Sequence, residues 1–223
     1  MEILASFLVG FIISRSYNKL ETYLVQDYEE ISTLIKWPFY IGSFIVGGLC
    51  ALTYGLYGLS LETFMVMSLM IVLTFLALFD LKYMLLPTKI IYPGFIIGVL
   101  YQLAQSILEN DYFYIVNGLL GAMVGYGLFC LLFYGSKYFL KKEGLGYGDV
   151  RLMGLIGMYI GIDYLAIMLI ISSVLALLVG IVLIMKKGKS EAFPFGPFLC
   201  MGAVIMSLFG NQMITWYLKW IGV

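Results

Sequence analysis

Long apolar segments alternate with short polar loops along the whole chain of 223 residues. A helix needs roughly 20 residues to cross a hydrocarbon core of about 30 Å, and most of these segments approach or reach that length. The pattern therefore predicts an all-α, polytopic membrane bundle with about eight transmembrane helices. The predicted spans are about 2–14, 38–57, 62–80, 90–108, 112–136, 149–162, 164–185 and 195–218.

The two ends of the chain are the least regular parts of this pattern. The first span is short, and the last contains Gly210 and Asn211, followed by Trp216 and Trp220. Aromatic residues of this kind favour the membrane interface, so the last span is a helix with an interfacial continuation or one long helix. We expect a single membrane-embedded domain over residues 1–223, with a short cytoplasmic loop at about 15–37.

The amino-acid composition limits the kinds of catalytic and metal site that the chain can form. The chain is 62% apolar and 12% charged, and it has no histidine, which excludes Ser-His-Asp and Cys-His sites. The three cysteines stand apart within apolar segments and form no CxxC pair, so we expect buried packing side chains and no metal site. They are Cys50, Cys130 and Cys200. No nucleic-acid partner is expected.

Basic residues lie almost entirely on one side of the predicted spans. With the N-terminus outside, Lys219 is the one basic residue among 13 that falls in an outer segment. The positive-inside rule therefore predicts this orientation. The first apolar run has no basic residue before it and Arg15 after it, which is the charge order of an uncleaved anchor.

Glycines recur inside the predicted spans, as in the pairs Gly47 with Gly48 and Gly118 with Gly121, and again at Gly125. Small residues allow the backbones of membrane helices to approach closely. These positions therefore predict a compact bundle, and they carry no information about chemistry.

Asp80 and Asp149 lie where apolar spans meet polar loops on the same predicted membrane face. Asp80 ends the third span and Asp149 opens the sixth, and two spans between them return the chain to that face. Carboxylates at the membrane are costly, and they persist at water-reachable edges, in pairs or in functional sites. We therefore predict that these two acids work together at the cytoplasmic face.

A pair of close carboxylates suits an aspartic protease. Two such groups do not both ionise easily, so one activates water while the other protonates the carbonyl or the leaving nitrogen. Gly146 and Gly148 have no side chains and would let an extended substrate backbone approach Asp149. Pro87 would end or bend the helix that follows Asp80.

Three motifs, and the order in which they occur along the chain, resemble those of the type IV prepilin leader peptidases, a family of GxGD aspartic membrane proteases. Residues 146–149 read Gly-Tyr-Gly-Asp, which is similar to the GxGD motif. Asp80 is followed seven residues later by Pro87, as in that family. Residues 193–198 read Phe-Pro-Phe-Gly-Pro-Phe and are similar to its PFGP segment before the last span.

The resemblance implies a membrane aspartic endopeptidase that removes the short basic leader of type IV prepilins or pseudopilins, such as those of secretion and competence systems. It cuts after a glycine at the cytoplasmic face of the bacterial cytoplasmic membrane, and the substrate enters sideways from the lipid bilayer. By motif position, Asp80 and Asp149 would be the catalytic pair. The remaining motif positions would bind substrate or shape the site: Gly146, Gly148, Pro87, Pro194, Gly196 and Pro197.

The chain departs from the family pattern at two single residues and in one loop. Thr88 replaces an acidic residue often found after the proline, and Arg151 replaces a lysine common after GxGD. The loop between the first two spans is also short and lacks the paired CxxC motifs of many relatives, so zinc is not expected. This loop does carry acidic residues that are candidates for docking the basic leader: Asp27, Glu29 and Glu30.

Proteolysis by two carboxylates requires no cofactor. Many relatives also methylate the new N-terminus with S-adenosylmethionine, an activity associated with the N-terminal region. Residues 9–15 resemble the family's first helix and its arginine only loosely, so this cofactor is expected only if methylation is retained. The oligomeric state does not follow from the sequence.

Other functions compete with this interpretation. A small ion-coupled transporter could use Asp80 and Asp149, but both acids lie at one face and no inverted repeat with broken helices is evident. Other GxGD proteases, the presenilin and signal-peptide-peptidase group, carry a PAL motif that this chain lacks. An inactive scaffold of a pilus assembly machine is a further alternative, which retention of both acids disfavours.

Overall fold

A computed structural model describes residues 2–14, 16–25, 40–139, 145–187 and 193–221. Helices dominate these ranges, and no strand occurs in them. The helices are α1 (Glu2–Ser14), α2 (Tyr17–Val25), α3 (Tyr40–Tyr57), α4 (Leu61–Tyr83), α5 (Thr88–Leu108), α6 (Phe113–Phe139), α7 (Tyr147–Lys187) and α8 (Gly196–Ile221). The prediction of an all-α bundle is confirmed.

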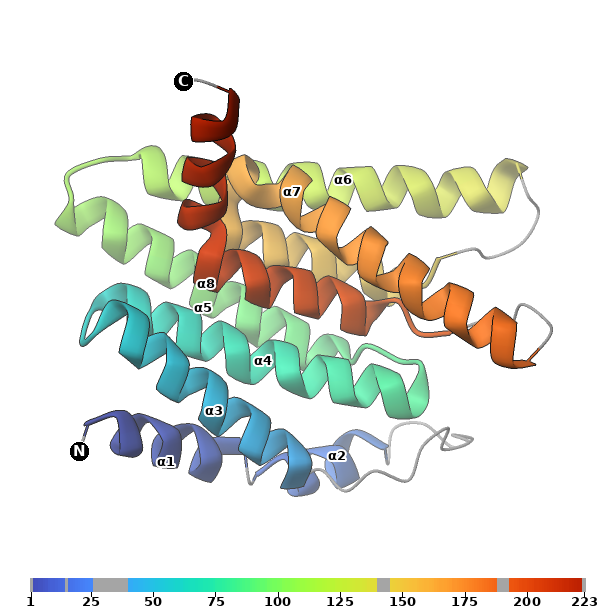
Figure 1. Ribbon diagram of the computed structural model, residues 1–223, viewed down its shortest axis with the longest axis horizontal. Coiled ribbons are helices and arrows are strands. Elements are labelled where there is room, and N and C mark those ends of the chain that lie inside the picture. Colours follow the sequence, from blue (N-terminus) through green and yellow to red (C-terminus); the bar gives the residue numbers. More distant parts are fainter. Residues whose placement is uncertain (1, 15, 26–39, 140–144, 188–192, 222–223) are drawn as a thin grey trace.

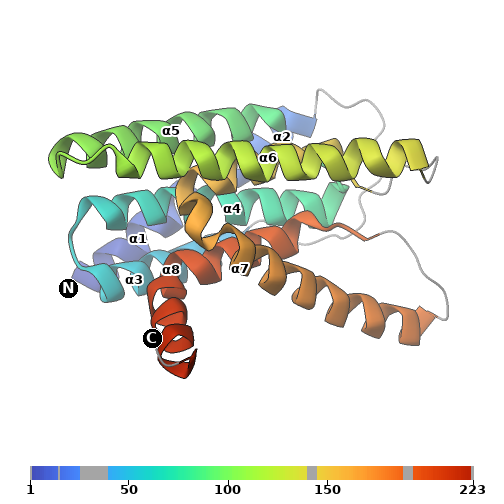
Figure 2. The ribbon, with the colours of Figure 1, turned by 90° about the horizontal axis from the view of Figure 1, so that it is seen from above.

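Most of these helices run roughly along one common direction, as Figures 1 and 2 show. Within the described residues, α4 to α8 are long and apolar enough to cross a membrane, and α1 and α3 contain shorter apolar helices. The chain is therefore a multi-pass membrane protein. α8 starts in the common direction, and its C-terminal part turns steeply away from the bundle (Figure 1).

The sixth and seventh predicted spans both lie in α7, which consists of two helices joined by a kink at Gly161. This glycine has φ 72° and ψ 175°, a backbone conformation that residues with a Cβ rarely adopt. Asn117 of α6 stabilises the break, because its side chain accepts a hydrogen bond from the Ile162 N–H at 2.9 Å and donates one to Asp163 at 2.8 Å. The two parts of α7 can therefore point in different directions (Figure 2).

The first half of α7 is the centre of the bundle. Its side chains pack against α4, α5, α6 and α8, whereas the half after Gly161 is mostly exposed. Several of its residues are fully buried: Val150, Leu152, Met153, Leu155, Ile156 and Met158. In this half of α7 the residues after Asp149 form the apolar core, so the N-terminal end of the helix is held in a fixed position.

Glycines bring α6 and α7 into close contact, as the sequence predicted. A Cβ placed on Gly121 would lie 2.3 Å from the carbonyl oxygen of Gly157, and one on Gly118 would lie 2.8 Å from that of Met158. Not every glycine has this role, since Gly48 faces open space. The shortest of these contacts with backbone atoms occur between α6 and α7.

The segment at about 15–37, predicted as a loop, contains the helix α2. Tyr17 of this helix is buried, and its hydroxyl donates a hydrogen bond to the carbonyl of Ile71 in α4. Burial raises the pKa of Tyr17, so the phenol remains a neutral donor. Glu21 forms an ion pair with Lys82, which ties α2 to the end of α4 that carries the first candidate acid.

Candidate active site

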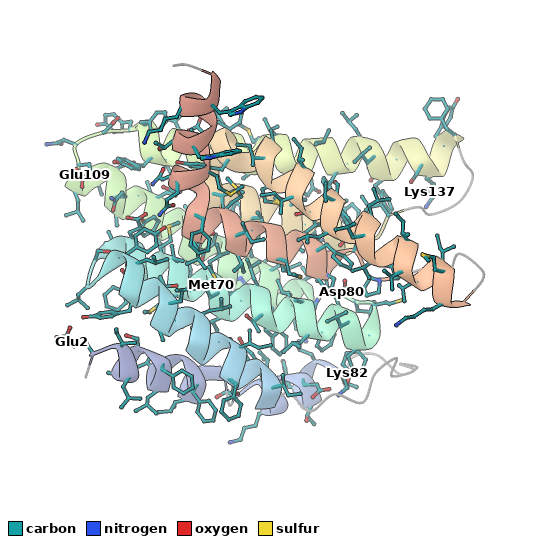
Figure 3. All side chains as sticks on the ribbon, in the orientation of Figure 1. Glu2, Met70, Asp80, Lys82, Glu109 and Lys137 are labelled. Carbon is teal, nitrogen blue, oxygen red and sulfur yellow. The ribbon has the colours of Figure 1, made fainter. Side chains whose placement is uncertain are left out.

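The first candidate acid, Asp80, lies in the last turn of α4. The helix ends at Met84, whose backbone is left-handed (φ 52°) and whose N–H donates to the carbonyl of Asp80. Pro87 then precedes the first residue of α5, where its missing N–H costs no helical hydrogen bond. The side chain of Asp80 is turned into the bundle, and only 5% of the residue is exposed (Figure 3).

The second candidate acid, Asp149, lies in the first turn of α7. The backbone N–H of Gly146 donates to its carboxylate, and the carbonyl of Gly146 accepts from the Asp149 N–H at 3.1 Å. The positive end of the helix dipole favours a carboxylate in this turn. Asp149 is 7% exposed, so both acids are held inside the protein by helix ends.

The N-terminal end of α8 completes the surroundings of Asp80. Gly196 is the first residue of this helix, and its backbone N–H donates to the Asp80 carboxylate. Such an N–H has no partner within its own helix, so an anion stabilises it. A Cβ on Gly196 would lie 2.6 Å from Oδ2 of Asp80, so the close approach of α8 to this carboxylate requires a glycine.

The structure brings the two acids together. The charge of Asp149 acts on the Asp80 carboxyl, and both acids act on the thiol of Cys200, which is buried in α8. Three helix ends, those of α4, α7 and α8, thus converge on one small region. This convergence brings the two acids within range of one another's charge.

Leu86 lies between the glycines that accompany the two acids. A Cβ on Gly148 would meet the Leu86 Cβ at 2.8 Å, and a Cβ on Gly196 would meet its Cδ1 at 3.4 Å. The side chain therefore packs against the first turns of both α7 and α8. Sequence reasoning included Leu86 in a motif but assigned it no role, because contacts across three elements leave no periodic signal.

One oxygen of the site has no hydrogen-bond partner. Oδ1 of Asp149 is buried and accepts no hydrogen bond from the described residues. A buried polar atom without a partner is costly, and natural proteins tolerate such atoms mostly where function uses them. This oxygen is therefore available to a water molecule or to a substrate group.

The two departures from the family pattern meet in space. Arg151 of α7 donates a hydrogen bond to the hydroxyl of Thr88 in the first turn of α5. Its guanidinium also lies 4.7 Å from the centre of the Tyr147 ring, and the hydroxyl of Tyr147 is 2.8 Å from that of Tyr126. Sequence reasoning singled out Thr88 and Arg151 separately and missed that they are partners.

Two larger cavities flank the region of the acids. One, of about 300 Å³, is almost entirely apolar and lies between α3, α4 and α8, where Pro197 and Cys200 contribute to its wall. The other, of about 350 Å³, lies between α5, α6 and α7 and includes Tyr147 and Arg151. A smaller cavity of about 120 Å³, beside Glu62 and Tyr164, lies on the far side of the bundle from the three helix ends.

The other residues predicted for the site have more varied positions. Gly146 and Gly148 flank the start of α7, Pro197 lies in the first turn of α8, and Pro194 is half-buried just before that helix. The predicted leader-docking residues, Asp27, Glu29 and Glu30, lie outside the described residues. Within the described ranges, no three acidic or cysteine side chains come together as metal ligands.

Comparison with known proteins supports the motif assignment. A family model described as the type IV leader peptidase family matches residues 67–181, which include both acids. A prepilin leader peptidase/N-methyltransferase of Aeromonas hydrophila is 34% identical over 149 residues, which are 66% of this chain and 50% of that protein. Proteins of the same name from Pseudomonas putida and Pseudomonas aeruginosa are 33% and 26% identical over 74% and 86% of this chain.

The chain spans about half the length of the curated relatives it matches. No solved structure matches it. The family model covers more than half of the chain, and the matched segment contains most of α4, all of α5 and α6, and most of α7. The chain therefore belongs to the type IV leader peptidase family.

Proposed function

We propose that this protein is an aspartic endopeptidase that removes the leader of type IV prepilins or pseudopilins at the membrane surface. The observation that carries the proposal is the unpartnered Oδ1 of Asp149, which is buried next to a second carboxyl group, Asp80. The names of the relatives support this substrate class. The N-terminal segment of a prepilin, with its basic leader and apolar helix, is the expected partner together with the bilayer.

The proposed reaction uses one acid as a base and the other as an acid. One carboxylate takes a proton from water, which attacks the carbonyl carbon of the last leader residue, a glycine, while the protonated carboxyl donates its proton to the carbonyl oxygen. Collapse of the tetrahedral intermediate then breaks the C–N bond, and the departing nitrogen takes a proton from the pair. Fixed helix ends hold both acids in place, so little reorganisation is needed during the reaction.

Methylation stands apart from this mechanism. S-adenosylmethionine carries a sulfonium cation, and the charged residue of the 350 Å³ cavity is Arg151, which disfavours a cationic ligand. The apolar cavity beside Pro197 offers no polar group of the required kind, and the 120 Å³ cavity is smaller than typical ligand pockets of about 300–1,000 Å³. These three cavities therefore do not fit S-adenosylmethionine.

Cleavage of a co-expressed prepilin tests the proposal. We expect Asp80→Asn and Asp149→Asn each to reduce leader removal by at least about 100-fold, because asparagine keeps the shape of aspartate but cannot transfer the proton. A gel shift and the mass of the new N-terminus report the cut, and the same mass reports any methyl group. Asp163→Asn is the matched control, because Asp163 contacts Asn117 at the break in α7, away from the pair.

Normal membrane levels of both variants are required for this comparison. Full cleavage by either variant would remove that aspartate from the mechanism. Cleavage that stops equally in Asp163→Asn would indicate a folding defect.

The acidic residues of the segment before α3 are proposed to attract the basic leader. Neutralising Asp27, Glu29 and Glu30 together should weaken cleavage most at low salt, because screening grows with ionic strength. Unchanged cleavage and unchanged salt dependence would show that these three residues do not dock the leader.

A further inference from the structure

We propose that the 350 Å³ cavity between α5, α6 and α7 binds an anionic phospholipid, with the lipid phosphate on Arg151 and an acyl chain along the apolar wall. This inference goes beyond the proposed peptidase activity and does not depend on it. It rests on the charge of Arg151, on the distribution of polar and apolar groups in the cavity, and on the opening of the cavity toward the lipid-facing surface.

The guanidinium of Arg151 has no acidic partner within the described part of the chain. Its contacts are the neutral hydroxyl of Thr88 and the face of the Tyr147 ring. The ion pair between Lys82 and Glu21 involves other elements. An arginine beside apolar surfaces is stabilised by an anion, and its planar donors match the oxygens of a phosphate group.

The cavity has a polar end and an apolar end. At the polar end the hydroxyls of Tyr126 and Tyr147 are hydrogen-bonded at 2.8 Å beside Arg151. Leu119 lies seven residues before Tyr126 on α6, so the cavity extends about 10 Å along this helix. The apolar residues that line the cavity are Ile91, Phe95, Leu119, Ala122, Met123 and Leu155.

The position of the cavity also suits a lipid. Arg151 lies about one turn from the start of α7, which is the depth at which arginine side chains reach phosphate groups of the membrane interface. Tyr92 of α5 and Met123 of α6 both line the cavity, and they are 58% and 62% exposed. A lipid chain can therefore enter from the side of the bundle without a conformational change.

A polypeptide is a less suitable occupant. The basic leader of a prepilin would be repelled by Arg151, and a free inorganic anion would leave the apolar wall without a partner. A phospholipid satisfies both ends of the cavity at once. We therefore assign the site to a lipid headgroup joined to an acyl chain.

Lipid binding to the purified full-length chain in detergent tests the assignment. Native mass spectrometry would compare phosphatidylglycerol with diacylglycerol, which has the chains but no phosphate, and inorganic phosphate would serve as a competitor. We expect a preference for phosphatidylglycerol that Arg151→Gln weakens about tenfold or more, as for the loss of a hydrogen bond to a charged group. Lys186→Gln, which removes an exposed cation at the other end of α7, should leave binding unchanged.

Two further variants distinguish the loss of the binding site from misfolding of the protein. Leu119→Trp would fill the apolar end from a position that is already partly exposed, and it should weaken binding of phosphatidylglycerol while Arg151 is intact. Arg151→Lys keeps the charge and should retain much of the binding. Each variant would first be compared with the wild type in thermal unfolding and in size-exclusion chromatography.

Three outcomes would overturn the proposal. Equal lipid binding by the wild type and Arg151→Gln would remove the phosphate contact, and displacement of the lipid by inorganic phosphate at similar concentrations would indicate a simple anion site. If Arg151→Gln left lipid binding intact but raised the KM for a prepilin peptide, the site would belong to the substrate. Because binding is measured without substrate turnover, a failure of the peptidase proposal would not affect this result.

Discussion

The positions of the two acids follow from the ends of the helices that carry them. Asp149 accepts a hydrogen bond from the Gly146 N–H in the first turn of α7, and Asp80 accepts one from the Gly196 N–H at the start of α8. Backbone donors at helix N-termini are fixed, and they stabilise carboxylates without requiring basic side chains. Two acids can therefore remain together inside an apolar bundle.

At the residue scale, Gly196 is the glycine that lies closest to a candidate catalytic carboxylate. In Gly196→Ala the new methyl group would meet Oδ2 of Asp80 at 2.6 Å and force either the carboxylate or α8 to move. Displacements of about 1 Å in a catalytic site can cost about 100-fold in rate. We expect prepilin cleavage to fall by about that factor in a membrane assay.

Gly127→Ala is the control for this experiment. Gly127 lies in α6, and a Cβ there would meet nothing within 4 Å. Alanine is the better helix former, so this variant should cleave normally. Full activity of Gly196→Ala at wild-type protein levels would show that the contact between Gly196 and Asp80 does not position the acid.

At the element scale, the contact of α6 with α7 determines where Asp149 lies. Gly121 and Gly157 face one another, and a Cβ on Gly157 would lie only 2.2 Å from the carbonyl oxygen of Gly121. Asn117 holds the break at Gly161 one turn further along. The first half of α7 is thus clamped by α6 along its length, and only this half carries a candidate catalytic residue.

Separating these two helices should destabilise the protein. We expect Gly121→Ala and Gly157→Ala each to lower the free energy of unfolding by about 1–3 kcal/mol, the usual cost of overpacking. Thermal unfolding in detergent would report this as a lower Tm. Gly135→Ala, on the same helix with open space around it, should show no loss. Equal Tm values for all of these variants would contradict the close contact.

At the scale of the whole molecule, the basic residues that Figure 3 labels lie toward one end of the bundle. Figure 3 shows Glu2 and Glu109 at one end, and Asp80, Lys82 and Lys137 toward the other. Basic residues favour the cytoplasmic side of a membrane. We propose that the end with the two candidate catalytic acids faces the cytoplasm and that the N-terminus lies outside.

Cysteine labelling of intact cells tests this orientation. A membrane-impermeant thiol reagent should label Glu109→Cys in intact cells, and it should label Lys137→Cys only after the membrane is opened. Both residues are exposed, so accessibility will reflect the side of the membrane. The native Cys50 and Cys200 are buried, and Cys130 would be replaced by serine. The opposite labelling pattern would reverse the proposed topology.

The helices themselves could be predicted, because membrane spans are determined by local apolar length. The exceptions have physical reasons. α2 is short and only partly apolar, so its contacts through Tyr17 and Glu21 to α4 leave no signal in a hydropathy pattern. The two helices of α7 were predicted as separate spans divided at residue 163, and the structure joins them at Gly161, because a positive φ at a glycine leaves no signal in a hydropathy pattern.

The sequence by itself determined the all-α membrane class, the approximate spans and, through ordered motifs, the two acids and the family. These properties depend on residue type and spacing along the chain. Only the tertiary structure decided that Asp80 and Asp149 meet, that Leu86 packs between Gly148 and Gly196, and that Arg151 binds Thr88. Such contacts join residues distant in sequence, and packing of whole helices, which no local pattern encodes, brings them together.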